Sequence, residues 1–149
     1  MKRKAKFVFG IPTVQRPVQD YLLITLQSLI KNLNVTERNK ILLVLLIAEI
    51  DPFKINNITN CYPEYSNKTT FDDPLYRVRW RTKQNLDFAF LMNYCKDRGE
   101  YYIQLEDDII SRKNYVTIIE NHLKSVSKSK DWFLVTLSNL GYIGKLIKS

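Results

Sequence analysis

Apolar residues along the chain occur either in short runs or at helical spacing. Short runs of strand-forming residues predict strands at residues 6–9, 41–47, 78–82, 101–105 and 132–137. Apolar residues three and four apart predict amphipathic helices at residues 20–33, from Leu86 to a cap near Gly99, and from Asn114 to Val126. Strands and helices that alternate in this order predict an α/β domain with a mainly parallel sheet.

Local signals predict where some of these elements end. Gly10 and Pro12 break the apolar pattern, so the first strand is expected to end before them. The run from Ile41 to Ile47 has no polar residue and is typical of a parallel strand covered on both faces. Residues 51–75 hold three prolines among many Asn and Thr, which predicts an irregular segment.

The composition predicts one folded domain. The chain has 149 residues, of which 45% are hydrophobic and 26% are charged, the balance of a globular protein. A net charge of +8 favours an anionic partner, either a nucleic acid or a small ligand. The basic residues lack the interleaved aromatics of an RNA-recognition strand, so nucleic acid is the weaker hypothesis.

Signals for cellular compartment and cysteine chemistry are sparse. Acceptor triplets for N-glycosylation at Asn34, Asn57 and Asn67 favour a protein of the secretory pathway. The apolar stretch near the start is too short for a signal peptide, and no apolar run reaches the roughly 20 residues of a membrane span. Cys61 and Cys95 are too few for a zinc site, and both a disulfide and free thiols fit the sequence.

Polar residues follow three of the predicted strands at the points where they end. These segments are Pro12–Arg16, Glu49–Asp51 and Glu106–Asp108. In open α/β sheets, ligands bind beyond the carboxyl ends of the strands. A carboxylate pair there can hold magnesium or manganese, and such a cation can bridge a diphosphate. A solvated acidic turn explains the adjacent carboxylates equally well.

A basic segment precedes the middle helix. As a strand, it would place four basic side chains on one face: Arg77, Arg79, Arg81 and Lys83. They would form either a phosphate-binding ridge or an ordinary exposed surface. A helix N-terminus after Lys83 would favour an anion and would carry polar side chains in its first turn: Gln84, Asn85 and Asp87. Trp80 and His122, the only histidine, are predicted to be structural.

Four segments together resemble one enzyme family. They are Phe9–Arg16 (FGIPTVQR), Arg77–Asp87 (RVRWRTKQNLD), Tyr101–Ile110 (YYIQLEDDII) and Leu140–Lys145 (LGYIGK). In this order they resemble the N-acetylglucosaminyltransferase IV family, the alpha-1,3-mannosyl-glycoprotein 4-beta-N-acetylglucosaminyltransferases of the Golgi. The resemblance covers nearly the whole chain.

This resemblance implies a fold and a reaction. The fold is a GT-A-type, Rossmann-like nucleotide-sugar-binding domain over residues 1–149, incomplete at its C-terminal side. The reaction transfers GlcNAc from UDP-GlcNAc, in β1,4 linkage, to the α1,3-mannose arm of an N-glycan acceptor on a glycoprotein. Because an α-linked donor gives a β-linked product, the chemistry inverts and needs a carboxylate base and a divalent metal, expected to be Mn²⁺. Golgi localisation and no nucleic-acid partner are also implied.

The resemblance assigns site residues as well. Asp108 matches the metal ligand of the family's D-x-D motif. The residues that match donor-binding positions are Thr13, Arg16, Glu49, Asp51, Arg81, Asn85, Asp87, Glu106 and Asp107. No residue is identified as the catalytic base.

Departures from the family pattern raise a second hypothesis. The segment Ala48–Asp51 reads AEID where family members carry GETD, and Thr136 stands where they carry a glutamate. A membrane anchor and a C-terminal carbohydrate-binding module are not expected within this chain. The alternative function is a catalytically inactive family member that binds the donor or regulates other Golgi glycosyltransferases.

Overall fold

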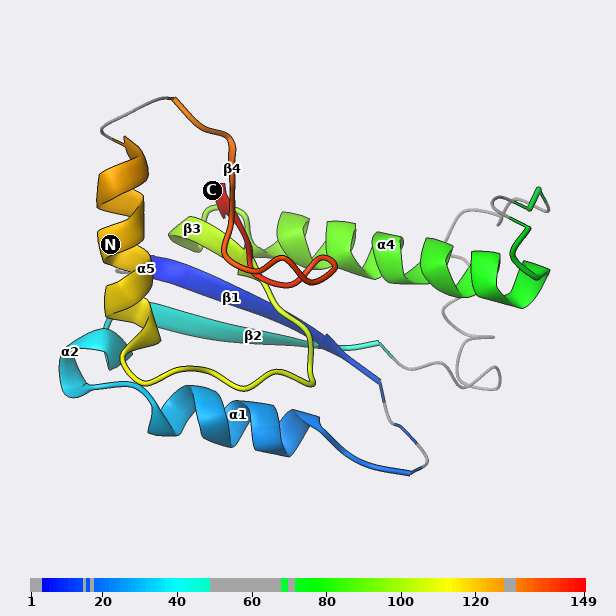
Figure 1. Cartoon of the computed structure of the whole chain (residues 1–149), viewed down its shortest axis with the longest axis horizontal. Helices are drawn as coiled ribbons and strands as arrows, with labels where there is room; N and C mark the ends of the chain where they lie inside the picture. Colours follow the sequence, from blue (N-terminus) through cyan, green and yellow to red (C-terminus); the bar gives the residue numbers. More distant parts are fainter. Residues whose placement is uncertain (1–3, 15, 17, 49–67, 70–71, 128–130) are drawn as a thin grey trace.

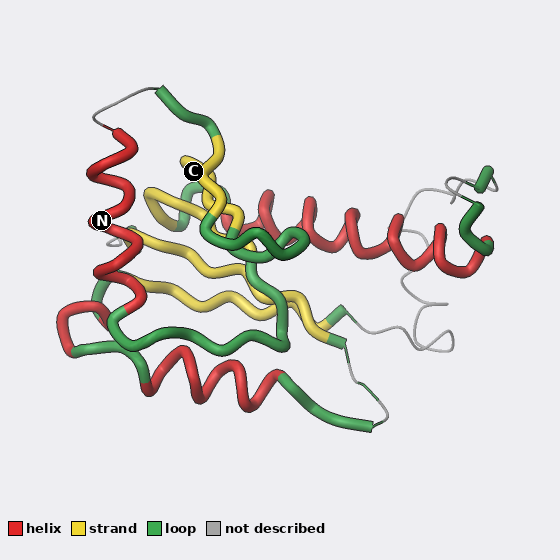
Figure 2. Tube along the Cα trace, in the orientation of Figure 1, coloured by secondary structure: helices red, strands yellow, loops and turns green. Residues whose placement is uncertain are grey.

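A mixed sheet of five strands forms the centre of the protein, with helices against both of its faces (Figures 1 and 2). The computed structural model describes residues 4–14, 16, 18–48, 68–69, 72–127 and 131–149. Across the sheet the strands follow the order β2–β1–β3–β5–β4. This architecture confirms the predicted α/β class.

The elements alternate along the chain much as the sequence predicts. The strands are β1 (Ala5–Thr13), β2 (Ile41–Ile47), β3 (Gly99–Gln104), β4 (Leu134–Thr136) and β5 (Lys145–Lys148). The helices are α1 (Leu22–Lys31), α2 (Val35–Arg38), α4 (Leu75–Cys95) and α5 (Tyr115–Ser127). β1 pairs in parallel with β2 and β3, whereas β5 is antiparallel to β3 and β4. Of the described strands, β5 alone therefore runs against the others.

Helix α4 corrects the prediction for the basic segment. The predicted strand at residues 78–82 is wrong, and so is the predicted helix start after Lys83, because the helix begins at Leu75 behind Pro74. Its buried residues include Phe88, Leu91 and Cys95, which lie on one side at helical spacing. The alternating basic side chains consequently point in different directions around a helix and do not form a ridge.

Strand β1 continues through the residues that were expected to end it. The prediction of an end before Gly10 and Pro12 is wrong, since β1 runs to Thr13. A Cβ atom at Gly10 would lie 2.3 Å from the Tyr102 hydroxyl, so the glycine makes room for this neighbouring ring. Pro12 lies beyond the last β1–β3 pair, where β1 pairs only with β2 and needs fewer backbone donors.

The two edges of the sheet also differ from the prediction. β2 is not covered on both faces, because it is an edge strand whose Leu45 and Ile47 are 41% and 75% exposed. The last predicted strand, at residues 132–137, is shorter, and β5 was not predicted at all. With only two apolar residues between lysines, β5 is too short to give a periodic signal.

The core consists of two layers, one on each face of the sheet. The larger cluster joins β1 and β3 to α1 and α5 through residues such as Phe9, Leu29 and Val116. The smaller cluster lies under α4 and contains Val8, Leu91, Cys95 and Tyr102. Cys95 is a free thiol whose pKa is raised to about 11 by burial, whereas Cys61 lies outside the described residues.

Two compartment signals can be placed on the structure. Asn34 is exposed and caps α2, with its side-chain oxygen accepting from the Glu37 amide at 2.9 Å. The other two glycosylation triplets begin outside the described residues. Among the described helices, none is both long enough and apolar enough to cross a membrane.

Candidate functional site

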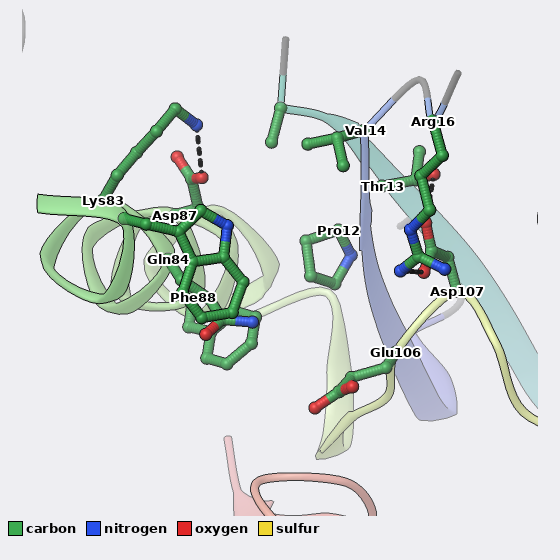
Figure 3. A pocket seen from close by; sticks show the side chains of 12 residues that line it. Pro12, Thr13, Val14, Arg16, Lys83, Gln84, Asp87, Phe88, Glu106 and Asp107 are labelled. Carbon is green, nitrogen blue, oxygen red and sulfur yellow. Dashed lines mark hydrogen bonds and ion pairs between the residues drawn. The ribbon is translucent and has the colours of Figure 1, made fainter. Parts of the chain in front are cut away.

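A cavity of about 330 Å³ lies at the carboxyl edge of the sheet, between the ends of β1 and β3 and helix α4. The N-terminal turns of α4 extend past the strand ends, so this helix overhangs the sheet edge (Figure 1). In Figure 3, the labelled side chains of α4 face those of the β1 end across the cavity. The position is the one at which open α/β sheets bind ligands.

An arginine–aspartate pair joins the β1 loop to the acidic triplet. Arg16 Nη2 donates to Asp107 Oδ1 at 2.7 Å, and the Thr13 hydroxyl donates to Asp107 Oδ2 at 2.6 Å. Both carboxylate oxygens of Asp107 are thus engaged, and the residue is only 5% exposed. Asp107 therefore orients Arg16 and is the least available of the three carboxylates for a ligand.

Helix α1 fixes the backbone of the same turn. The Thr25 hydroxyl donates to the Asp107 carbonyl at 2.8 Å and accepts from the Ile109 amide at 3.0 Å. Thr25 is almost fully buried, so this contact is shielded from competing water. The turn that carries the acidic residues is consequently anchored to the larger of the two core layers.

The other two carboxylates of the triplet, on Glu106 and Asp108, are less buried than that of Asp107. Burial, reinforced by the nearby charges of Asp108 and Asp107, raises the pKa of Glu106, and Arg16 opposes this shift. Asp108 is more exposed, with its carboxylate 3.8 Å from the second guanidinium nitrogen of Arg16. A concentration of negative charge of this kind favours a cation.

The part of α4 from Trp80 to Phe88 forms the opposite wall of the cavity. It presents side chains at helical spacing: Trp80, Lys83, Gln84, Asp87 and Phe88. Lys83 Nζ and Asp87 Oδ2 form an ion pair at 2.6 Å, so the two charges largely cancel (Figure 3). The sequence predicted a structural role for Trp80 and placed Gln84 only among the polar side chains of a helix's first turn. A helical interpretation of this segment would have placed both beside Asp87.

The structure brings some of the predicted site residues together and separates others. Thr13, Arg16, Asp87, Glu106 and Asp107 line the cavity, and Asp108 follows them in the same turn. Arg81 on α4 forms an ion pair with Asp73, which precedes the helix, and Asn85 is exposed on α4; neither lines the cavity. Glu49 and Asp51 lie outside the described residues, and His122 is exposed on α5.

The segment that follows β4 lies close to the acidic turn. The Gly144 amide donates to the Gln104 carbonyl at 2.7 Å, which holds this loop at the end of β3. Tyr142 stacks on Phe88 with 5.6 Å between ring centroids, and a Cβ atom on Gly141 would lie 3.9 Å from Glu106 Oε1. The fourth sequence motif, Leu140–Lys145, thus belongs to the surroundings of the same cavity.

A second hollow, of about 460 Å³, lies on the opposite face of the sheet. It is lined mainly by apolar side chains of the sheet and α5, and its polar lining residues include Thr136 and Ser138. Thr136, which the resemblance set against a glutamate of the family, lines this hollow and not the acidic cavity. Its walls lack the paired charges that mark the first cavity.

The described residues contain no group of three His, Cys, Asp or Glu side chains that could enclose a metal ion. A Mg²⁺ or Mn²⁺ site commonly uses only one or two carboxylates and completes its shell with substrate phosphates and water. Glu106 and Asp108 match that smaller requirement. The residues present therefore fit an ion held jointly by the protein and a phosphorylated ligand.

Comparison with known proteins identifies the family. The family model of the MGAT4 conserved region matches residues 53–149. The chain is 41% identical to alpha-1,3-mannosyl-glycoprotein 4-beta-N-acetylglucosaminyltransferase B of Mus musculus over 95% of this chain and 30% of that protein. It is 42% identical to enzyme A of Bos taurus over 95% of this chain and 31% of that protein.

A third relative gives similar values. The chain is 40% identical to enzyme B of Homo sapiens, again over 95% of this chain and 30% of that protein. The chain thus spans about 30% of the length of the curated relatives it matches. The matched region includes the acidic turn, α4 and the loop after β4. The chain belongs to the family of alpha-1,3-mannosyl-glycoprotein 4-beta-N-acetylglucosaminyltransferases.

Proposed function

We propose that this chain forms the donor-binding part of an N-acetylglucosaminyltransferase of N-glycan branching, built on a GT-A-type fold. The donor is UDP-GlcNAc, the acceptor is the α1,3-mannose arm of a glycoprotein N-glycan, and the reaction takes place in the Golgi. The observation that carries the proposal is the pair of Arg16 and Asp107 at 2.7 Å, because it joins two family motifs at one cavity.

The cavity offers separate groups for the diphosphate and for a metal ion. Arg16 uses one guanidinium nitrogen on Asp107 and retains further N–H donors, which suit phosphate oxygens. Glu106 and Asp108 would hold the metal ion. When bound, Mn²⁺ would neutralise the charge that develops on the leaving diphosphate.

The remaining site residues position these groups. Thr13 and Thr25 fix the side chain and the backbone of Asp107, so that Arg16 and the acidic turn keep a constant separation. Such preorganisation lowers the cost of arranging charges as the diphosphate departs. Inversion requires the acceptor hydroxyl to approach the anomeric carbon on the face opposite the diphosphate.

The experiment is a thermal-unfolding titration of the purified chain with UDP-GlcNAc and Mn²⁺, with and without EDTA. A ligand at 100 times its Kd should stabilise the fold by about 2.7 kcal/mol, which raises Tm by roughly 5–10 °C for a domain of this size. The rise should disappear in EDTA and in Asp108→Ala.

The matched control is Asp131→Ala, which removes an exposed carboxylate outside the cavity. This variant should keep the full rise in Tm. A folded wild-type chain whose Tm is unchanged by UDP-GlcNAc and Mn²⁺ would contradict the proposal. Stabilisation that persists in EDTA would contradict the metal dependence alone.

A further inference from the structure

The α4 side of the cavity has a chemistry different from that of the acidic turn. Trp80 is 50% exposed although it lines a concave site, and Gln84 lies one helical turn further along the same wall. Among the described residues, none forms a hydrogen bond with the side-chain amide of Gln84. An aromatic face and a half-buried side-chain amide that can bind a ligand therefore lie one turn apart on the same wall.

The surroundings of this pair are neutral and partly apolar. Lys83 and Asp87 neutralise each other at 2.6 Å, so neither presents an uncompensated charge to the ligand. Pro12 and Val14 face the α4 side chains across the cavity (Figure 3). The result is a slot with an indole on one side and aliphatic surface on the other, which suits a flat and uncharged ring.

The ring must also offer hydrogen-bonding groups at its edge. A glutamine amide supplies both a donor and an acceptor, as the edge of a nucleobase requires. Nucleobases stack on tryptophan, whereas a hexose offers a puckered ring with hydroxyl groups all around it. The slot therefore fits the base better than the sugar of a nucleotide-sugar.

We propose that Trp80 and Gln84 bind the nucleobase of the donor, with its ring stacked on the indole and its edge hydrogen-bonded to the Gln84 amide. The inference rests on the function proposed above. It divides the cavity into two parts: the base lies against α4, and the diphosphate lies against Arg16 and the acidic turn.

The test uses Trp80 as its own reporter. The chain has two tryptophans, so Trp132→Phe leaves Trp80 as the only one, and Trp132 lies outside the cavity against Tyr101. In this background, UDP with Mn²⁺ should quench the fluorescence. N-acetylglucosamine 1-phosphate with Mn²⁺, followed by calorimetry, should bind without quenching because it lacks the base.

Substitution then separates stacking from a structural role. Trp80→Ala should weaken UDP binding about tenfold or more, as loss of base–aromatic stacking does, and should leave the affinity for N-acetylglucosamine 1-phosphate unchanged. Gln84→Leu should weaken UDP binding severalfold while the quenching at saturation is retained. The matched control is Tyr76→Ala, which removes an exposed aromatic one turn earlier on α4 and outside the cavity.

Each contrary outcome has its own meaning. UDP affinity that is unchanged in Trp80→Ala overturns the inference and leaves the proposed function standing. An equal loss for UDP and for the sugar phosphate also overturns it, because Trp80 would then only support the fold of the site. A wild-type chain that binds neither UDP nor UDP-GlcNAc overturns both proposals.

Discussion

The two faces of the sheet are built differently. Among the described residues, the face covered by α1 and α5 holds a cluster of twelve buried residues, whereas the face covered by α4 holds a cluster of four. The α1–α5 face is also linked by polar contacts between distant segments. Glu37 on α2 accepts from Thr117 on α5 at 2.7 Å, and Glu120 on α5 pairs with Lys6 and Lys40 at 2.8 Å each.

Helix α4 is held by different means. Between described residues, its known ion pairs and side-chain hydrogen bonds lie largely within the helix or at its own start, as with Lys83–Asp87, Arg81–Asp73 and Thr82–Val78. Half of the candidate site is thus anchored to a thick core, and the other half rests on a thin one. Ligand-binding segments are often drawn from the less stable part of a fold, because they must adjust to the ligand.

The largest expected effect comes from a matched pair of core truncations. Leu29 on α1 and Leu91 on α4 are 2% and 1% exposed, so one substitution can be compared on the two faces. We expect Leu29→Ala to lower the free energy of unfolding by about 3–5 kcal/mol and Leu91→Ala by about 2–3 kcal/mol. The smaller core layer under α4 can relax more easily into the space that the truncated Leu91 side chain leaves.

Urea denaturation of both variants measures the difference. The slopes of the two transitions should match that of the wild type, so that midpoints report stability. If Leu91→Ala costs as much as Leu29→Ala or more, the two faces contribute equally and α4 is not the weaker layer.

The second prediction concerns the polar contacts of the α1–α5 face. Burial alone would raise the pKa of Glu37, but hydrogen bonds from Thr117 and Asn34 outweigh it, so the pKa lies below the ordinary 4.5. The ionised carboxylate therefore stabilises the fold above about pH 4.5, and this contribution is lost as the pH falls through the lowered pKa. We expect Glu37→Gln to cost about 2–3 kcal/mol at pH 7.

The pH dependence of this loss is the measurement. The difference between Glu37→Gln and the wild type should shrink as the pH falls below 4.5, because the wild-type carboxylate is then protonated too. Glu100→Gln, at an exposed position on β3, serves as the control and should change stability by less than about 0.5 kcal/mol. A loss for Glu37→Gln that is constant between pH 3 and pH 7 would contradict the role of ionisation.

The third prediction tests the packing on the α4 face. A Cβ atom at Gly10 would meet the Tyr102 hydroxyl at 2.3 Å and the ring carbons at 2.7 and 2.8 Å. We expect Gly10→Ala to cost about 1–2 kcal/mol, because overpacking is destabilising but the far end of a ring can shift. Adding Tyr102→Phe should recover part of the loss, which a double-mutant cycle by urea denaturation would detect. Strictly additive losses would contradict the clash.

How much the sequence predicts depends on the pattern in each element. The unbroken run of β2 and the regular spacing in α5 predicted both elements closely. The beginning of α4 was misread because alternating arginines around Val78 and Trp80 imitate a strand. β1 was cut short because the reason for Gly10 is a neighbouring ring, a tertiary contact that no local pattern encodes.

The sequence likewise predicted one part of the candidate site and missed another. The carboxyl-edge position of the acidic turn followed from the strand pattern, and Thr13 and Arg16 were correctly expected to lie beside it. The α4 wall did not follow, because Trp80 and Gln84 share a face with Asp87 only in a helix. Arg81 and Asn85 match donor-binding positions of the family, and neither lines the cavity.

The smallest expected effect tests the discarded phosphate ridge. Arg77 is 61% exposed and pairs with Asp73 at 3.5 Å, an arrangement that contributes at most about 1 kcal/mol and weakens in salt. In a strand-like ridge, Arg77 would share the phosphate with Arg81, and Arg77→Ala would weaken UDP binding. In helix α4, Arg77 lies outside the cavity, so Arg77→Ala should leave both the UDP affinity and the free energy of unfolding within error of the wild type.

Arg16→Ala, by contrast, should reduce the affinity for UDP at least tenfold, because it removes the guanidinium at the acidic turn. Calorimetric titration of the two arginine variants makes the comparison directly. Equal losses of UDP affinity in both variants would support a phosphate-binding ridge that includes Arg77. A loss confined to Arg16→Ala places phosphate binding at the acidic turn, on the well-anchored side of the cavity.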